Sequence, residues 1–291
     1  ALSIGGNHTM HVLRRNLDCQ ILLFNNEIYG LTKGQYSPTS RVGTRSPSTP
    51  FGSVDRPVTP CMFALGSGAR FIARGIDVHK NLPDVLKAAH AHKGAAFVEI
   101  FQNCIVYNDD VFAPFTAKDN AGRQLWLKAG EPMLFDGGSK GIALDREALA
   151  LRVVDVEGGD WQAAGVIVHD VTNRSIAHML VEMPFGPFPM ALGVLYDDPR
   201  PTFESAVREQ NFASAEGKAS DLQALGTREE RHPDRIADDR GRDRPGIDHQ
   251  RVEAAPAGGD RAGETDRAGP GDENGLVYHQ AAHRCDAGTH P

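Results

Sequence analysis

The residues best suited to chemistry follow an apolar run near the start of the chain. Residues 20–24, Gln-Ile-Leu-Leu-Phe, lead into Asn25 and Asn26 and then into a loop that mixes Gly with Thr, Lys and Gln. An apolar run without alternation is typical of a strand buried on both faces of a parallel sheet. Ligands of open α/β sheets bind just beyond the carboxyl ends of such strands. Amide oxygens there could bind a hard cation such as Mg²⁺, and the alternative is a simple Asx turn.

The segment before this strand predicts a helix with Asn7 as its N-cap, because apolar residues recur at helical spacing within residues 10–17. The glycine pair at residues 5–6 would let backbone N–H groups approach an anion at the helix N-terminus. His8 and His11 stand three residues apart on this helix. Taken alone, this spacing favours packing or capping over metal binding.

Helical and extended patterns alternate further along the chain. One helix is predicted to start at Pro60, since proline favours the first helical position, and another to cover residues 83–92. His92, at the end of that helix, is interpreted as solvated. Strands are predicted at residues 69–73 and 95–101. Strands and helices that alternate at these lengths predict βαβ units, a parallel sheet and so an α/β fold.

Residues 111–210 predict a smaller mixed region of short strands and hairpins, separated by glycine and charged turns. Within it, residues 166–170 are predicted to form a buried strand, and Asn173 to cap the helix that follows. His169 and Asp170 could form a catalytic pair. A histidine satisfied at a strand end is the favoured interpretation.

The composition limits the classes of function. A formal net charge of -7 over 291 residues gives no general reason to expect nucleic acid or an anionic membrane surface as partner. No apolar run approaches the roughly 18 residues of a membrane span. The four cysteines are widely scattered, which argues against a disulfide scaffold and fits a reducing cytoplasm.

Two segments resemble a known family: Ile4-Gly5-Gly6-Asn7-His8, and residues 25–39, which read Asn-Asn-Glu-Ile-Tyr-Gly-Leu-Thr-Lys-Gly-Gln-Tyr-Ser-Pro-Thr. The chain resembles the thiamine-diphosphate-binding β subunit of 2-oxoacid:ferredoxin oxidoreductases, closest to the 2-oxoglutarate branch. The resemblance covers roughly residues 1–225 and implies a parallel-sheet thiamine-diphosphate-binding fold. The family's diphosphate motif is Gly-Asp-Gly, a spacer and then Asn-Asn, so we expect its first half immediately before Ala1.

This resemblance implies a site built on the second half of the motif. Asn26 would bind Mg²⁺ through its side chain and Ile28 through its backbone oxygen. The cofactor-binding residues that the resemblance implies are His8, Gly30, Leu31 and Thr32. Because the motif's aspartate is not among the residues given, affinity for Mg²⁺ and diphosphate should fall.

The resemblance also implies catalysis and electron transfer. Lys33 would pair with the distal carboxylate of 2-oxoglutarate, or else be a solvated loop lysine. Cys104 corresponds to the family's last [4Fe-4S] cysteine, although its spacing alone favours an inert thiol. The other cluster cysteines are not among the residues given, so this chain alone should hold no cluster. The implied partners are the α subunit, ferredoxin, 2-oxoglutarate and coenzyme A.

From Gly226 onward the resemblance stops, and the chain repeats Arg, Asp, Gly, Ala and Pro with few aliphatic residues. Such a segment cannot bury enough apolar surface to offset its chain entropy, so residues 211–291 are predicted to be disordered. A natural charged linker is one explanation. A shift of reading frame near Leu225 is our hypothesis.

The sequence thus predicts a thiamine-diphosphate-binding domain at residues 1–110 with its N-terminal part missing, a C-terminal mixed region at 111–210, and the tail. The leading function is the β subunit of a 2-oxoglutarate:ferredoxin oxidoreductase that oxidatively decarboxylates its substrate only in complex with an α subunit. Two alternatives stay open. One is a non-catalytic remnant that folds without the cofactor, and the other is a non-oxidative thiamine diphosphate enzyme.

Overall fold

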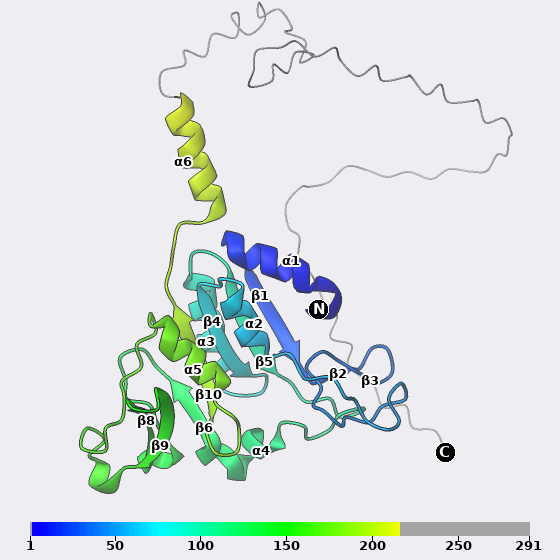
Figure 1. The fold of residues 1–291 in the computed structure, drawn as a ribbon, viewed down its shortest axis with the longest axis vertical. Coiled ribbons are helices and arrows are strands. Elements are labelled where there is room, and N and C mark those ends of the chain that lie inside the picture. Colours follow the sequence, from blue (N-terminus) through cyan, green and yellow to red (C-terminus); the bar gives the residue numbers. More distant parts are fainter. Residues whose placement is uncertain (1, 216–291) are drawn as a thin grey trace, which may run out of the picture. The chain divides into compact units, whose positions relative to one another are not determined.

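A five-stranded sheet forms the centre of residues 2–215, the part of the chain that the computed structural model describes (Figure 1). In spatial order its strands are β1 (Gln20–Asn25), β5 (Ala96–Phe101), β4 (Phe71–Ile76), β10 (Met190–Asp197) and β6 (Gln124–Leu127). β1, β5 and β4 are parallel, which confirms the predicted parallel sheet. β10 runs antiparallel to β4 and parallel to β6, so the whole sheet is mixed.

Helices cover the two faces of this sheet. They are α1 (Leu2–Arg15), α2 (Pro60–Gly66), α3 (Leu82–Ala91) and α5 (Arg174–Glu182). On one face, α1, α2 and α5 bury Leu13, Leu65 and Leu180 in one cluster with Ile72 and Phe97 of the sheet. On the other face, α3 buries Val85 and Ala89 against the remaining side chains of β4 and β5. The predicted helices at Pro60 and at residues 83–92 are thereby confirmed.

β1 is an edge strand, and this position contradicts the prediction that it is buried on both faces. Leu22 and Phe24 are 44% and 46% exposed, whereas Asn25 on the opposite face is buried. α3 packs against β4 and β5, so the described chain places no helix over the face of β1 that carries these two side chains. An apolar run reports the character of side chains, and it cannot distinguish a central strand from an edge strand.

α1 also differs from its prediction. It contains the glycine pair at residues 5–6, so Asn7 is not its N-cap and the predicted anion site at a helix N-terminus is wrong. The helix ends before Asn16, which takes a φ of 53°. Asn16 then donates hydrogen bonds to the backbone oxygens of Arg200 and Pro201. Intrinsic helix propensity is a weak preference, so the glycine pair can lie inside a helix that packs Leu13 into the core.

Smaller elements complete the described region. They are the hairpin of β2 (Ile28–Tyr29) and β3 (Gln35–Tyr36), the antiparallel sheet of β7 (Leu134–Phe135), β8 (Lys140–Asp145) and β9 (Ala150–Asp155), the helix α4 (Ala113–Thr116), and the 3-10 helices η1 (Lys118–Arg123), η2 (Asp136–Gly138) and η3 (Glu157–Gly159).

Residues 166–170 are not the predicted strand. Val166 and Val168 form isolated bridges to different segments, so no ladder develops. Asn173 does cap α5, accepting a hydrogen bond from the Ile176 amide at 3.1 Å.

The predicted boundary at residue 110 lies within one core, because β6 and β10 join the sheet of β1, β5 and β4. The predicted start of the tail at residue 211 lies within α6 (Phe203–Ala215). Residues 216–291, with Cys285 and the proposed frame shift, lie outside the described residues.

His92 is buried, which corrects the interpretation that it is solvated. Its Nδ1 lies 2.7 Å from Asp197 Oδ1 at the end of β10, and its ring packs 5.4 Å from that of Phe71. Asp197 is 105 residues away in the sequence, so local pattern could not reveal this partner.

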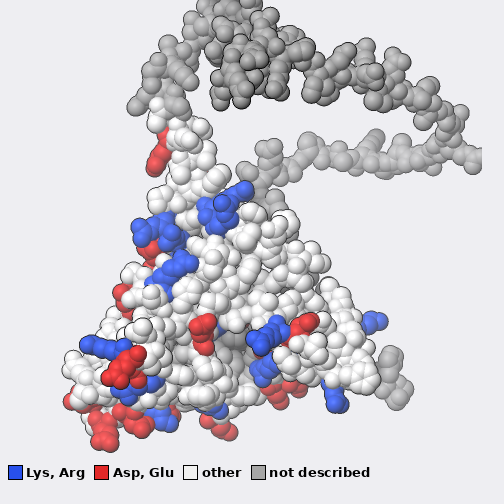
Figure 2. All heavy atoms as spheres, in the orientation of Figure 1, with Lys and Arg blue, Asp and Glu red and all other residues white. Residues whose placement is uncertain are grey.

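The described surface carries charges of both signs. Figure 2 shows acidic and basic side chains lying close to one another on the visible face. Between residues 2 and 215, no helix combines the length and apolar character that crossing a bilayer requires.

Candidate functional site

The chain turns sharply at the carboxyl end of β1, and two asparagines shape the turn. Asn25 Oδ1 accepts a hydrogen bond from the Glu27 amide at 3.1 Å, and Asn26 Oδ1 accepts one from the Ile28 amide at 3.3 Å. These are two consecutive Asx turns, the alternative that the sequence left open. Glu27 takes a left-handed φ of 54°, which directs the chain into β2.

The two asparagines have different surroundings. Asn25 is buried, its Nδ2 donates to Glu99 Oε1 of β5 at 2.9 Å, and the Thr39 hydroxyl donates to its Oδ1 at 2.8 Å. Asn26 is half-buried, and its backbone oxygen accepts a hydrogen bond from Asn108 Nδ2 at 2.9 Å. Among the described residues, the one hydrogen bond to the Asn26 side-chain oxygen is the longer bond from the Ile28 amide. Asn26 is therefore the asparagine of the pair that remains open to a ligand.

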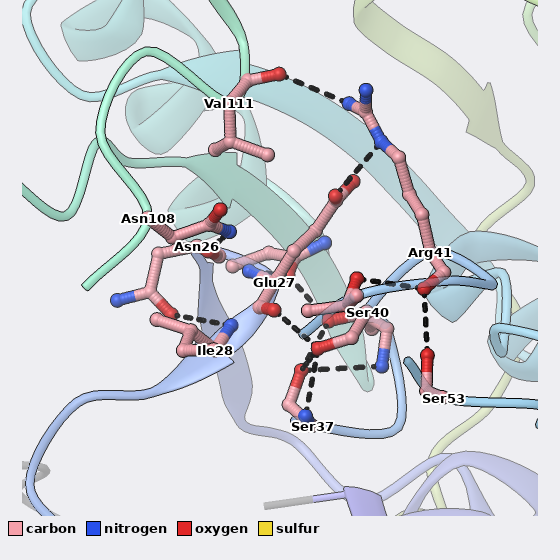
Figure 3. Close-up of polar contacts among 12 residues, drawn as sticks. Asn26, Glu27, Ile28, Ser37, Ser40, Arg41, Ser53, Asn108 and Val111 are labelled. Atoms are coloured by element: carbon pink, nitrogen blue, oxygen red, sulfur yellow. Dashed lines mark hydrogen bonds and ion pairs between the residues drawn. The ribbon is translucent and has the colours of Figure 1, made fainter. Parts of the chain in front are cut away.

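A loop is attached to this turn by an ion pair (Figure 3). Arg41 Nε lies 2.9 Å from Glu27 Oε2, and Arg41 Nη2 donates to the Val111 backbone oxygen at 3.0 Å. The Ser40 hydroxyl donates to the Glu27 backbone oxygen, and the Ser53 hydroxyl donates to that of Arg41 at 2.9 Å. Burial raises the pKa of the Glu27 carboxyl, although Arg41 acts in the opposite direction. The turn and the loop are thus held together by both side chains and backbone.

Residues 104–107 pack against the hairpin of β2 and β3. A methyl group at Gly30 would lie 3.7 Å from Cys104 Sγ, and one at Gly34 would lie 2.7 Å from the Tyr107 ring. Two residues that the sequence singled out separately, Gly30 and Cys104, are therefore neighbours.

Leu31, Thr32 and Lys33 form an exposed turn between β2 and β3. The Lys33 amide donates to the Gly30 oxygen at 3.1 Å, and the Thr32 hydroxyl donates to the Gln35 side chain. The Leu31 side chain is 87% exposed. The Lys33 side chain is also exposed and takes part in no ion pair with another described residue, so its charge is available to an anionic ligand.

His8 lies on the exposed surface of α1. The contact between α1 and the hairpin is made by the first helical turn, where Ser3 Oγ lies 2.6 Å from the Tyr29 hydroxyl. His11 keeps a buried Nδ1 without a hydrogen-bond partner among the described residues. These contacts do not involve His8, and its role near a phosphate stays a prediction.

The donor atoms fit a hard cation in part. Asn26 Oδ1 and the Ile28 backbone oxygen belong to the class of ligand that Mg²⁺ prefers. No group of three His, Cys, Asp or Glu side chains suited to a metal ion occurs within residues 2–215. A [4Fe-4S] cluster needs four thiolates, whereas this region has three separated cysteines, Cys19, Cys61 and Cys104. The described residues therefore offer two oxygen atoms of the kind that Mg²⁺ prefers, and they do not fit a cluster.

The sequence reasoning missed a buried ion pair beneath the turn. Glu99 of β5 is 2% exposed, and its Oε2 lies 3.0 Å from Arg74 Nε of β4. The Cys61 thiol of α2 donates to the same carboxylate at 3.3 Å, and burial together with Glu99 raises its pKa. The sequence signal for this pair was charge at apolar runs. Glu99 lies inside the predicted strand at residues 95–101, and Arg74 directly follows the predicted strand at residues 69–73.

His169 and Asp170 do not form a catalytic pair. His169 is buried, and its Nε2 donates to the Val194 backbone oxygen at 2.8 Å, while the exposed Asp170 accepts a hydrogen bond from the Thr172 hydroxyl. Burial lowers the pKa of His169, and the bonds from Thr172 lower that of Asp170. The favoured interpretation of a satisfied histidine is borne out for Nε2 only, because the buried His169 Nδ1 has no hydrogen-bond partner among the described residues.

Comparison with known proteins agrees with the family resemblance that the motif at residues 25–39 indicates. A family model described as thiamine pyrophosphate enzyme, C-terminal TPP binding domain, matches residues 1–100. The chain is 42% identical over 229 residues to the 2-oxoglutarate oxidoreductase subunit KorB of Mycobacterium tuberculosis, and 44% identical over 115 residues to the β subunit of 2-oxoacid:ferredoxin oxidoreductase 1 of Aeropyrum pernix. These matches confirm the resemblance identified in the sequence.

The coverage of these relatives is partial. The first alignment includes 77% of this chain and 61% of the M. tuberculosis protein, and the second includes 39% and 36%. Among solved structures, the 2-oxoglutarate:ferredoxin oxidoreductase from Magnetococcus marinus, with 2-oxoglutarate, coenzyme A and succinyl-CoA bound, matches with a TM-score of 0.55 and 26% identity. That match covers 77% of this chain and 62% of the other, and it confirms the α/β fold.

Proposed function

We propose that this chain, a KorB-like homologue of the β subunits of 2-oxoacid:ferredoxin oxidoreductases, is the thiamine-diphosphate-binding subunit of a 2-oxoglutarate:ferredoxin oxidoreductase. The position of the Asn25–Ile28 turn carries this proposal. The turn lies at the carboxyl end of a parallel strand, where open α/β sheets bind ligands, and inside the segment that the thiamine pyrophosphate family model matches.

The turn would hold the metal and the diphosphate. Asn26 Oδ1 and the Ile28 backbone oxygen would bind Mg²⁺, and Gly30, Leu31 and Thr32 would line the diphosphate. The exposure of Leu31 and Thr32 in the hairpin turn supports the contact with the diphosphate, whereas Ile28 is 6% exposed. His8 would approach the phosphates from α1. Further oxygen ligands would come from the diphosphate, water or residues outside the described region.

Lys33 would set the choice of substrate. Its exposed cation would pair with the distal carboxylate of 2-oxoglutarate, in a charge-assisted contact that a monocarboxylic 2-oxoacid cannot make. Thiamine diphosphate, when bound, supplies the electron sink for loss of CO₂ from a 2-oxoacid. The part of Lys33 is to orient the substrate at that centre.

Electron transfer would require partners. Cys104, which lies beside Gly30, would be one ligand of a [4Fe-4S] cluster whose other cysteines lie outside the described residues. An α subunit would complete the site, ferredoxin would accept the electrons and coenzyme A would accept the acyl group. A reducing compartment such as the cytoplasm suits the free thiols.

The test is to express the chain with the α subunit and to measure thiamine diphosphate uptake with and without Mg²⁺. We expect Mg²⁺-dependent binding, and reduction of ferredoxin that requires both 2-oxoglutarate and coenzyme A. Release of CO₂ without reduction of ferredoxin would instead indicate a non-oxidative enzyme. A stable complex that takes up no thiamine diphosphate would identify a non-catalytic remnant and would overturn the proposal.

A further inference from the structure

We propose that Glu99 is a positioning residue for the turn after β1. Paired with Arg74, it holds the Asn25 side chain, and Asn25 in turn fixes the backbone that presents Asn26 and Ile28. The identity of the bound group rests on the proposed function. The support of the turn is a property of this chain alone and can be tested without any ligand.

The contacts form a continuous path from the middle of the sheet to the turn. Arg74 Nε of β4 donates to Glu99 Oε2 of β5 at 3.0 Å, and Glu99 Oε1 accepts from Asn25 Nδ2 of β1 at 2.9 Å. Asn25 Oδ1 then accepts from the Glu27 amide at 3.1 Å and from the Thr39 hydroxyl at 2.8 Å. One carboxylate therefore connects a buried guanidinium to a backbone amide of the turn.

The strand register places these side chains on one face of the sheet. Glu99 is opposite Arg74 on one side and opposite Leu23 on the other, so Asn25 follows two residues later on the same face of β1. Cys61 of α2 covers the carboxylate and donates to it. Arg74 and Glu99 are only 6% and 2% exposed. The group that supports the turn is therefore enclosed by protein.

The charge of Glu99 determines which way the Asn25 amide faces. An ionised carboxylate only accepts hydrogen bonds, so Asn25 must direct its NH₂ group toward Glu99 and its oxygen toward Glu27. A glutamine in place of Glu99 could offer either end of its amide, and the orientation of Asn25 would no longer be determined. Because an apolar pair of similar volume is often at least as stable as a buried ion pair, stability alone does not account for this one.

The test uses the full chain with two variants that interrupt the path, Asn25→Ala and Glu99→Gln. In the ligand-free chain, hydrogen exchange of the Glu27 amide should become about five- to tenfold faster in both, the factor expected for one lost hydrogen bond. In the complex with the α subunit, calorimetric titration with Mg²⁺ and thiamine diphosphate should show affinity about 10- to 100-fold weaker, as is typical when support of a metal ligand is lost.

Val98→Ala is the matched control. Val98 is the neighbour of Glu99 on β5, but it is buried against α3 on the other face. This variant should lose stability without a change in Glu27 exchange or in affinity. If Glu99→Gln does not fold, the pair variant Arg74→Met with Glu99→Leu removes both charges together and should show the same two effects.

The outcomes separate the two proposals. Wild-type exchange at Glu27 in Glu99→Gln or in Asn25→Ala, or equal effects in Val98→Ala, would overturn the positioning role. Faster exchange in the path variants, combined with no uptake of thiamine diphosphate by the wild-type complex, would uphold the positioning role and overturn the proposed function.

Discussion

Glu27 and Arg41 form an ion pair of 2.9 Å that joins the turn after β1 to the loop after β3. The Glu27 side chain is 13% exposed and that of Arg41 is 57% exposed, so solvent screens the attraction from one side. The main effect of such a pair is on geometry, because partly exposed ion pairs add little to global stability. Arg41 also binds the Val111 backbone, and so it connects three segments at the site.

We expect Arg41→Gln to loosen this loop while the fold is retained. The free energy of unfolding should fall by about 1 kcal/mol or less, because the pair is screened. Backbone amides of residues 40–53 should exchange faster, since the loop loses its attachment to Glu27 and Val111. Urea unfolding and hydrogen exchange measure the two quantities. Arg45→Gln, in the same loop at an exposed position, is the control, and equal exchange in both variants would contradict the role of Arg41.

Lys33→Gln should change the choice of substrate. Under the proposed function this variant loses a charge-assisted contact, which should raise the KM for 2-oxoglutarate about tenfold or more, while the KM for pyruvate stays the same. Steady-state reduction of ferredoxin by the complex with both substrates is the measurement. Lys87→Gln on α3 should change neither constant. A parallel rise in both KM values would show that Lys33 does not recognise the distal carboxylate.

Gly34→Ala should disturb the packing between the hairpin and residues 104–107. Its φ is 91°, and the added methyl group would lie 2.7 Å from the Tyr107 ring. Gly43 has a similar φ of 86° but open space around it, so Gly43→Ala isolates the backbone strain, about 1–2 kcal/mol. Gly34→Ala should lose about 1–3 kcal/mol more in urea unfolding, the usual cost of overpacking. Equal losses in the two variants would mean that Tyr107 moves aside freely.

We expect the free energy of unfolding to decrease in acid because of the buried His169. Burial lowers its folded-state pKa below the ordinary value of 6.5, so both states are neutral at higher pH and the His169 contribution is fully present there. As pH falls below about 6.5, the unfolded chain binds the proton more readily, and the free energy of unfolding decreases until the folded-state pKa is reached.

Urea unfolding between pH 8 and pH 5 measures this dependence. His169→Gln should reduce the loss of stability on acidification, whereas the exposed control His90→Gln should leave it as in the wild type. Identical pH profiles for His169→Gln and the wild type would show that other groups cause the loss.

The sequence by itself determined features that depend on residues close together along the chain. The apolar run and the two asparagines predicted a strand followed by a turn, and Asn173 predicted the start of α5, because Asx turns and N-caps form within a few residues. The motif from Asn25 onward indicated the family before the fold was known. These features are local, and the tertiary structure confirms them.

The tertiary structure decided how distant segments meet. Glu99 supports Asn25 across 74 residues, and Cys104 lies beside Gly30, because the strand order brings the ends of β1 and β5 together. That order also made β1 an edge strand and gave Asn25 a buried role while Asn26 stayed open. The chemistry of a side chain limits the contacts that the residue can make, whereas burial and strand order determine which of these contacts form.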